Sequence, residues 1–192
     1  MRTTWLVVCT LALGLCVSAW AGTNATTPVT DTLKVDYFSN ANTAGAPDAT
    51  LRLDNPGTSG GNICAAIYVF DAQQEMSECC SCLLTPDGLR TLSVNADLTS
   101  NPLTGVTLNT GVIKLVSTTV PGACPAYPFS ITPTPALRAW VTHIENKNFA
   151  VTETNAADAT LSANEVTRLQ AQCRAIWLDG SGAGQCSCGT GD

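Results

Sequence analysis

The sequence predicts a mainly β fold: an antiparallel β-sandwich with a C-terminal α-helix at about residues 162–178 and a disulfide-tethered tail. Three observations support this fold class. Short stretches that alternate apolar and polar residues recur between residues 33 and 154, with turn residues between them. One capped amphipathic segment follows them. Charged residues make up only 12% of the chain, and Thr, Ser, Asn, Gly and Pro take the polar positions, which is typical of exported β-rich proteins.

An export signal is predicted over residues 1–21. Arg2 gives a positive start, residues 5–17 form an apolar core too short to span a bilayer, and Ala19-Trp20-Ala21 is a small-x-small cleavage site. The mature chain is therefore expected to be secreted, to the periplasm or the extracellular space, after cleavage near Ala21. We expect a flexible lead over residues 22–30 and a single disulfide-stapled β-rich domain with its C-terminal helix over residues 31–192.

The charge balance excludes two classes of partner. Without Arg2, the mature chain keeps 8 of the 9 basic residues against 15 acidic ones, a net charge of about −7. Phosphate backbones and bare anionic lipid surfaces repel such a chain, so no nucleic acid partner is expected. No stretch of the mature chain reaches transmembrane length.

The expected strands follow in order. Ile63 to Phe70 is apolar throughout, which indicates a strand covered on both faces. Turn signals at Asn55-Pro56-Gly57 and Thr85-Pro86-Asp87-Gly88 end two of the strands. The predicted strands before the proline-rich segment span residues 33–38, 49–53, 63–70, 76–84, 89–94, 106–108 and 112–118.

The second half of the chain begins with a loop. Residues 121–135 hold five prolines, too many for a central strand, and predict an ordered surface loop held by Cys124. Residues 137–144 and 149–154 predict a hairpin.

The helix has a start signal, an apolar face and a stop signal. Ser162 and Glu165 form a capping box, and Gly180 supplies the stop. The expected buried face, at helical spacing, consists of Val166, Leu169, Cys173, Ile176 and Trp177.

The cysteines outside the export signal number eight: Cys64, Cys79, Cys80, Cys82, Cys124, Cys173, Cys186 and Cys188. An even count after an export signal predicts disulfides. Cys80 and Cys82 share one face of a strand, and so do Cys186 and Cys188 if the tail is extended. We therefore expect the tail to lie antiparallel to the 79–82 strand, joined to it by one or two bridges. Cys16 lies inside the signal, and the bulky Leu15 before it disfavours a lipid anchor.

A thiol or metal-binding protein is an alternative interpretation. Zinc knuckles space their cysteines by two to four residues, whereas the clusters here are spaced by zero and one. The single histidine, His143, adds little to a metal set, so neither a metal nor another cofactor is predicted. A Cys-x-x-Cys redox motif is also missing from the sequence.

A secreted hydrolase is the other alternative. Gly57-Thr58-Ser59-Gly60-Gly61 fits the Gly-x-Ser-x-Gly pattern, and Asp71 or Asp87 followed by His143 gives the chain order of a hydrolase triad. A strand, not the required helix, follows Ser59, so a Gly-rich turn is the simpler interpretation.

The acids Asp71, Glu75 and Glu78 offer a second catalytic pattern. They could form a glycosidase-like pair or a calcium site. A solvated turn accounts for them more simply, and no catalytic residue is assigned.

The run Glu78-Cys79-Cys80-Ser81-Cys82, the Thr85–Leu89 turn and the Gly-rich Cys-x-Cys tail resemble a group of uncharacterised small secreted cysteine-rich bacterial proteins. This resemblance implies an exported, disulfide-bonded domain, and it implies no activity and no site residues. The sequence as a whole favours a non-enzymatic structural or interaction domain. Its expected partner is a protein, or a second copy of the chain bound through sheet edges.

Overall fold

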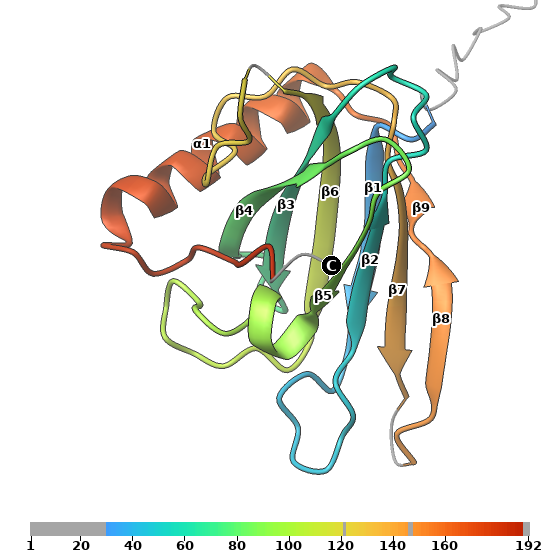
Figure 1. Ribbon diagram of the computed structural model, residues 1–192. Helices are drawn as coiled ribbons and strands as arrows, with labels where there is room; N and C mark the ends of the chain where they lie inside the picture. The colour runs from blue at the N-terminus through green and yellow to red at the C-terminus, as the bar shows by residue number, and fades with distance from the viewer. Residues whose placement is uncertain (1–29, 121, 146–147, 190–192) are drawn as a thin grey trace, which may run out of the picture.

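The computed structural model describes residues 30–120, 122–145 and 148–189 and shows the expected β-sandwich. Sheet A has the strand order β4-β3-β6-β1-β9, and sheet B has the order β5-β2-β7-β8. All strand pairs within the two sheets are antiparallel. The sheets face each other, and α1 lies across the outer face of sheet A (Figure 1). The predicted export signal and residues 22–29 of the predicted lead lie outside the described residues.

The element bounds follow the predicted order closely. The strands are β1 (Leu33–Phe38), β2 (Thr50–Asp54), β3 (Ile63–Asp71), β4 (Met76–Leu84), β5 (Leu89–Ser93), β6 (Gly111–Thr119), β7 (Arg138–Ile144), β8 (Val151–Asn155) and β9 (Ala157–Asp158). A π-helical turn, η1 (Val94–Leu98), follows β5, and α1 spans Ala163–Asp179. The predicted hairpin is confirmed, since β7 pairs with β8.

Strand β3 explains why a run of apolar residues can be a strand. Ile63, Ala65, Ile67 and Val69 point into the core between the sheets. Ala66, Tyr68 and Phe70 belong to a second cluster, which the helix covers. Both faces of the strand are therefore buried, as the absence of polar alternation predicted.

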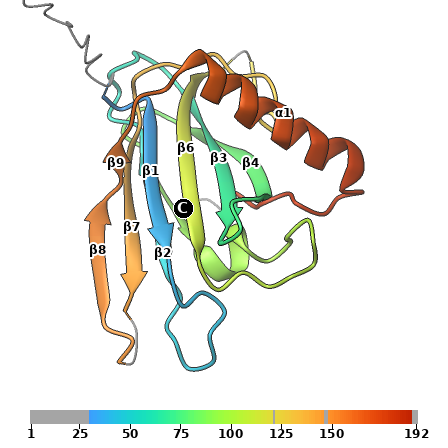
Figure 2. The same ribbon diagram turned by 180° about the vertical axis from the view of Figure 1, so that it is seen from behind.

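Helix α1 packs on sheet A through Leu169, Cys173 and Ile176, which contact side chains of β1, β3, β4 and β6. Figure 2 shows the helix crossing the outer face over β6, β3 and β4. The Ser162 side chain accepts a hydrogen bond from the Glu165 amide at 3.1 Å, so this part of the predicted cap is confirmed.

Two expectations about α1 differ from the structure. The Glu165 carboxylate does not serve the predicted capping box; it pairs with Lys114 on β6 and with Arg168. Trp177 was expected on the buried face but is 47% exposed. It packs instead against Phe129 of the 122–135 loop, with ring centroids 5.2 Å apart.

The expected strand at residues 106–108 is wrong. These residues are irregular, and Val106 is 66% exposed. The Leu108 carbonyl accepts a hydrogen bond from the Asn42 side chain at 2.9 Å. This side-chain donor takes the place of the backbone donor that a neighbouring strand would supply, so the segment does not join a sheet. The sequence did not predict η1 or the short β9.

The proline-rich loop is held against the outer face of sheet A. Cys124 is bonded to Cys64 of β3, and the Tyr68 hydroxyl donates to the Pro128 carbonyl at 2.9 Å. Within the described residues of the loop, this confirms an ordered segment held by Cys124. No helix in the described part of the chain is long and apolar enough to cross a bilayer.

Candidate functional site

The chemical groups most concentrated in one place are the sulfur atoms that join the tail to β4. Cys80 is bonded to Cys186, and Cys82 is bonded to Cys188. We call these two adjacent disulfides the tail ladder. Cys79 points to the opposite face of β4, where it is bonded to Cys173 of α1. The prediction of a disulfide-linked tail is confirmed.

The direction of the tail differs from the prediction. Cys79 and Gln185 form a parallel bridge, not the antiparallel pairing that was expected. The cause is the position of the helix end. Gly184 approaches the Ser77 carbonyl, and the Cys79 amide donates to the Gly184 carbonyl at 2.8 Å, so the tail reaches β4 near its start and then runs in the direction of the strand.

The tail also closes one side of the sandwich. The Ser187 amide donates to the Asp97 carbonyl of η1 at 2.8 Å. Arg90 of β5 donates from Nη1 to the Cys188 carbonyl at 2.7 Å. The tail therefore spans from sheet A at β4 to sheet B at β5, and the two bridges lie where the sheets meet.

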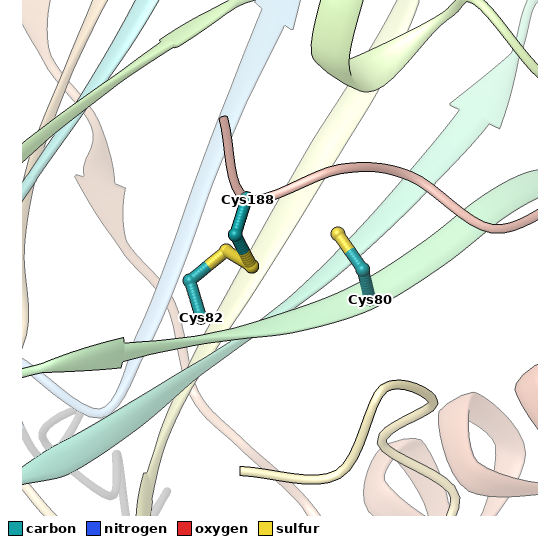
Figure 3. A group of neighbouring side chains, drawn as sticks. All are labelled: Cys80, Cys82 and Cys188. Carbon is teal, nitrogen blue, oxygen red and sulfur yellow. A yellow bond between two sulfur atoms is a disulfide. The ribbon is translucent and has the colours of Figure 1, made fainter. Parts of the chain in front are cut away.

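The sulfur atoms of Cys80, Cys82 and Cys188 lie within 4.8 Å of one another (Figure 3). Cys80, Cys82 and Cys186 are at most 4% exposed, whereas Cys188 is half-buried. A surface hollow of about 470 Å³ is lined by Cys80, Cys186 and Cys188 together with residues of β4, of two loops and of the tail: Ser81, Asn101, Ala126, Gln185 and Ser187. All of these sulfurs are in disulfides, so none is a thiolate that could bind a metal ion in this state.

A buried carboxyl group lies on the same strand as the ladder. Glu78 is fully buried, and its Oε1 accepts a hydrogen bond from the Asn101 amide at 3.1 Å. Its Oε2 has no partner in the described part of the structure. Burial raises the pKa of Glu78 from 4.5 to about 8, and the Asn101 hydrogen bond opposes that rise. The side chain is therefore protonated at neutral pH.

Asn101 connects Glu78 to the tail. Its side-chain amide donates to the carbonyls of Gly182 and Gln185, at 2.9 and 3.2 Å. One residue thus fixes the carboxyl group and the backbone that leads into the ladder. Sequence reasoning missed Asn101 and Arg90, because nothing local in the sequence marks a residue that contacts a tail some 80 to 100 positions away.

The residues of the hydrolase hypothesis do not come together. Ser59 is exposed in the β2–β3 turn, where its hydroxyl donates to the Gly61 carbonyl at 3.1 Å. That turn lies at the Arg138 end of β7, since Asp54 pairs with Arg138. His143 lies near the other end of β7, about 16 Å away at the usual rise per residue. Asp87 is close to the β2–β3 turn, but it has no histidine to orient there.

His143 is a buried structural side chain. It is 3% exposed, its Nε2 lies 2.7 Å from the Thr154 hydroxyl and 3.5 Å from Asp36, and its ring stacks on Tyr37. Burial raises the pKa of Asp36, and a backbone hydrogen bond from Tyr37 and the charge of His143 oppose that rise. These side chains connect β1 of sheet A to β7 and β8 of sheet B.

The acidic cluster divides between two environments. Asp71 Oδ1 accepts hydrogen bonds from the amides of Gln73 and Glu75, both at 2.9 Å, so it stabilises the β3–β4 turn. Glu75 is exposed in the same turn, whereas Glu78 is buried farther along β4. The three acids thus form neither a glycosidase-like pair nor a calcium loop.

No protein-family model matches the chain, and the comparisons with curated proteins and with solved structures found no match either.

Proposed function

We propose that this chain is a secreted structural or interaction domain whose disulfides hold a β-sandwich in one shape outside the cytoplasm. The observation that carries the proposal is the pattern of the four bridges. They join residues 60 to 106 positions apart and attach the proline-rich loop, the helix and the tail to β3 and β4. Covalent links over such distances are typical of proteins that function in an oxidising compartment.

The interaction surface of this proposal is the outer edge of β8. All residues of β8, Val151–Asn155, are exposed, and the strand stands at the end of sheet B. The edge strand β4 of sheet A is covered instead, because the tail hydrogen-bonds to it. An unprotected edge strand offers backbone donors and acceptors to a partner strand. A second copy of the chain, or a protein with an extended segment, would be bound there.

Two experiments test this function. Fractionation of expressing cells should recover the protein outside the cytoplasm with Gly22 as its N-terminal residue, and cytoplasmic protein with an intact N-terminus would contradict export. Val151→Pro removes a backbone donor on the free edge of β8, because the Glu145–Ala150 hydrogen bond fixes a register in which the Val151 amide points away from β7. Exposed Thr91→Pro on β5 serves as the matched edge variant. Concentration-dependent association that Val151→Pro abolishes supports the β8 edge, whereas a monomer at millimolar concentration contradicts self-association.

The hydrolase alternative has its own test. A serine-directed fluorophosphonate probe should leave Ser59 unlabelled, because His143 lies too far away to activate it. Labelling of Ser59 in the folded protein would restore the hydrolase hypothesis.

A further inference from the structure

The two bridges of the tail ladder lie close enough to exchange partners. A disulfide exchanges when a thiolate attacks one of its sulfur atoms, and the displaced sulfur leaves as a new thiolate. Sulfur atoms from both bridges, those of Cys80, Cys82 and Cys188, lie within 4.8 Å of one another (Figure 3). A thiolate produced in one bridge therefore has the sulfur of the other bridge beside it.

The ladder is also accessible, in contrast to the bridge on the other face of β4. Cys188 is half-buried and lines the hollow of about 470 Å³, together with Cys80 and Cys186. Both partners of the Cys79–Cys173 bridge are fully buried beneath α1. Cys188 is the most exposed of the four ladder cysteines, so we expect a small thiol that enters the hollow to attack there, and it cannot reach the helix bridge without opening the fold.

A positive charge lies at the backbone of Cys188. Arg90 donates to the Cys188 carbonyl at 2.7 Å, and its Nε is buried without a partner among the described residues. A neighbouring guanidinium favours the thiolate form of a cysteine, which makes that cysteine a better leaving group and a more available nucleophile.

We propose that the tail ladder is a thiol–disulfide exchange site that oxidises a low-molecular-weight thiol. In the first step the incoming thiolate bonds to the Cys188 sulfur, the Cys82–Cys188 bond breaks, and Cys82 leaves as a thiolate that takes up the proton of the incoming thiol. A second thiol then attacks the sulfur of the first. The two leave as one small disulfide, and Cys188 is released as a thiolate.

The second bridge completes the sequence. The Cys188 thiolate attacks the neighbouring Cys80 sulfur, the Cys80–Cys186 bond breaks, and Cys186 leaves and takes up the second proton. Two small thiols have been oxidised to one disulfide, and the ladder has been reduced by two electrons. The protein then holds a Cys80–Cys188 bridge with Cys82 and Cys186 as free thiols, and the tail stays attached to β4 in a shifted register.

Reduced glutathione is the probe for the test. The oxidised full-length mature protein is incubated with it at fixed pH, quenched with an alkylating reagent at intervals, and mapped by mass spectrometry without reduction. We expect a glutathione adduct at Cys188, then a Cys80–Cys188 peptide with alkylated Cys82 and Cys186. These changes should appear at least about tenfold faster than alkylation of Cys79 or Cys173.

Variants test the two features that carry the mechanism. Arg90→Gln should slow release of Cys188 from its glutathione adduct, and hence formation of the Cys80–Cys188 peptide, by about fivefold, because Cys188 is the thiolate that leaves in that step. Arg90→Lys, which keeps the charge, and Arg168→Gln, on the exposed helix surface, should react as the wild type does. A Cys80→Ser/Cys186→Ser double variant removes the second bridge. In this variant the glutathione adduct at Cys188 should persist, or Cys188 should return to Cys82.

Several results would overturn the proposal. Reduction of the Cys79–Cys173 bridge as early as the ladder would show that opening of the fold, and not the hollow, controls access. Loss of both ladder bridges with no Cys80–Cys188 peptide would show that the bridges react independently. An unreactive ladder would identify it as a purely structural crosslink. The wild-type time course alone distinguishes these results, so the test stands even if the cysteine variants fail to fold.

Discussion

Glu78 provides the sharpest test of the described core, because a protonated carboxyl buried in a protein makes stability depend on pH in a defined direction. Its pKa is raised by burial from 4.5 to about 8. Between these values the folded chain holds a proton on Glu78 and the unfolded chain does not. The free energy of unfolding therefore falls by about 1.4 kcal/mol per pH unit over this window. The contribution is fully present below pH 4.5 and is lost as the pH rises to about 8.

The perturbation is Glu78→Gln. Glutamine keeps an oxygen to accept the Asn101 hydrogen bond, fits the same space and carries no charge at any pH. The variant and the wild type should be of similar stability near pH 4. Above pH 8 the variant should be more stable by roughly 4 kcal/mol, because the wild type must then ionise a buried group or unfold.

The assay is guanidinium unfolding with the disulfides intact, followed by circular dichroism at several pH values. The quantity of interest is the difference between variant and wild type, since other titrating groups cancel in it. Glu75→Gln, in the exposed β3–β4 turn, is the matched control and should show a flat difference. A flat difference for Glu78→Gln as well, or a variant that loses stability as the pH rises, would refute the reasoning.

Three other predictions concern packing and charge. Cys79→Ser/Cys173→Ser opens a crosslink over 94 residues and should cost about 4–5 kcal/mol of unfolding free energy in the same assay; a loss below 1 kcal/mol would mean that the helix does not depend on its bridge. Gly111→Ala places a Cβ within 2.2 Å of the Phe70 carbonyl oxygen and should destabilise by about 2–3 kcal/mol, whereas Gly61→Ala, with open space around it, should be nearly neutral in thermal unfolding. Burial alone would raise the pKa of Glu165, but hydrogen bonds from Lys114 and Arg168, together with their charges, outweigh it and hold the pKa of this carboxyl below its usual range. The stabilising contribution of Glu165 is therefore present above the usual pKa and lost as the pH falls through the folded value. Glu165→Gln should therefore destabilise the protein at pH 7 by up to about 1 kcal/mol and have no effect near pH 2, and an equal loss at both pH values would contradict this.

The features that the sequence predicted are those with a local signal. The apolar run of β3, the turn at residues 85–88 and the Ser162 cap depend on neighbours a few residues away, and the structure confirms them. The grouping of Cys80 with Cys82 on one face also follows from strand geometry alone.

The features that sequence reasoning missed depend on distant segments. The parallel direction of the tail follows from where α1 ends over sheet A, and the burial of Glu78 follows from the position of Asn101 in a separate loop. Trp177 has helical spacing with Cys173, yet it packs against Phe129 of the proline-rich loop and stays half-exposed. Periodicity identifies a face of an element, but the extent of the surface that covers this face is a property of the whole fold.

Disulfide mapping of the native mature protein tests the central claim most directly, because the sandwich, the helix and the tail are all joined by sulfur. We expect no free thiol and four peptide pairs: Cys64–Cys124, Cys79–Cys173, Cys80–Cys186 and Cys82–Cys188. Free cysteines throughout, or a tail joined to residues other than Cys80 and Cys82, would contradict the account.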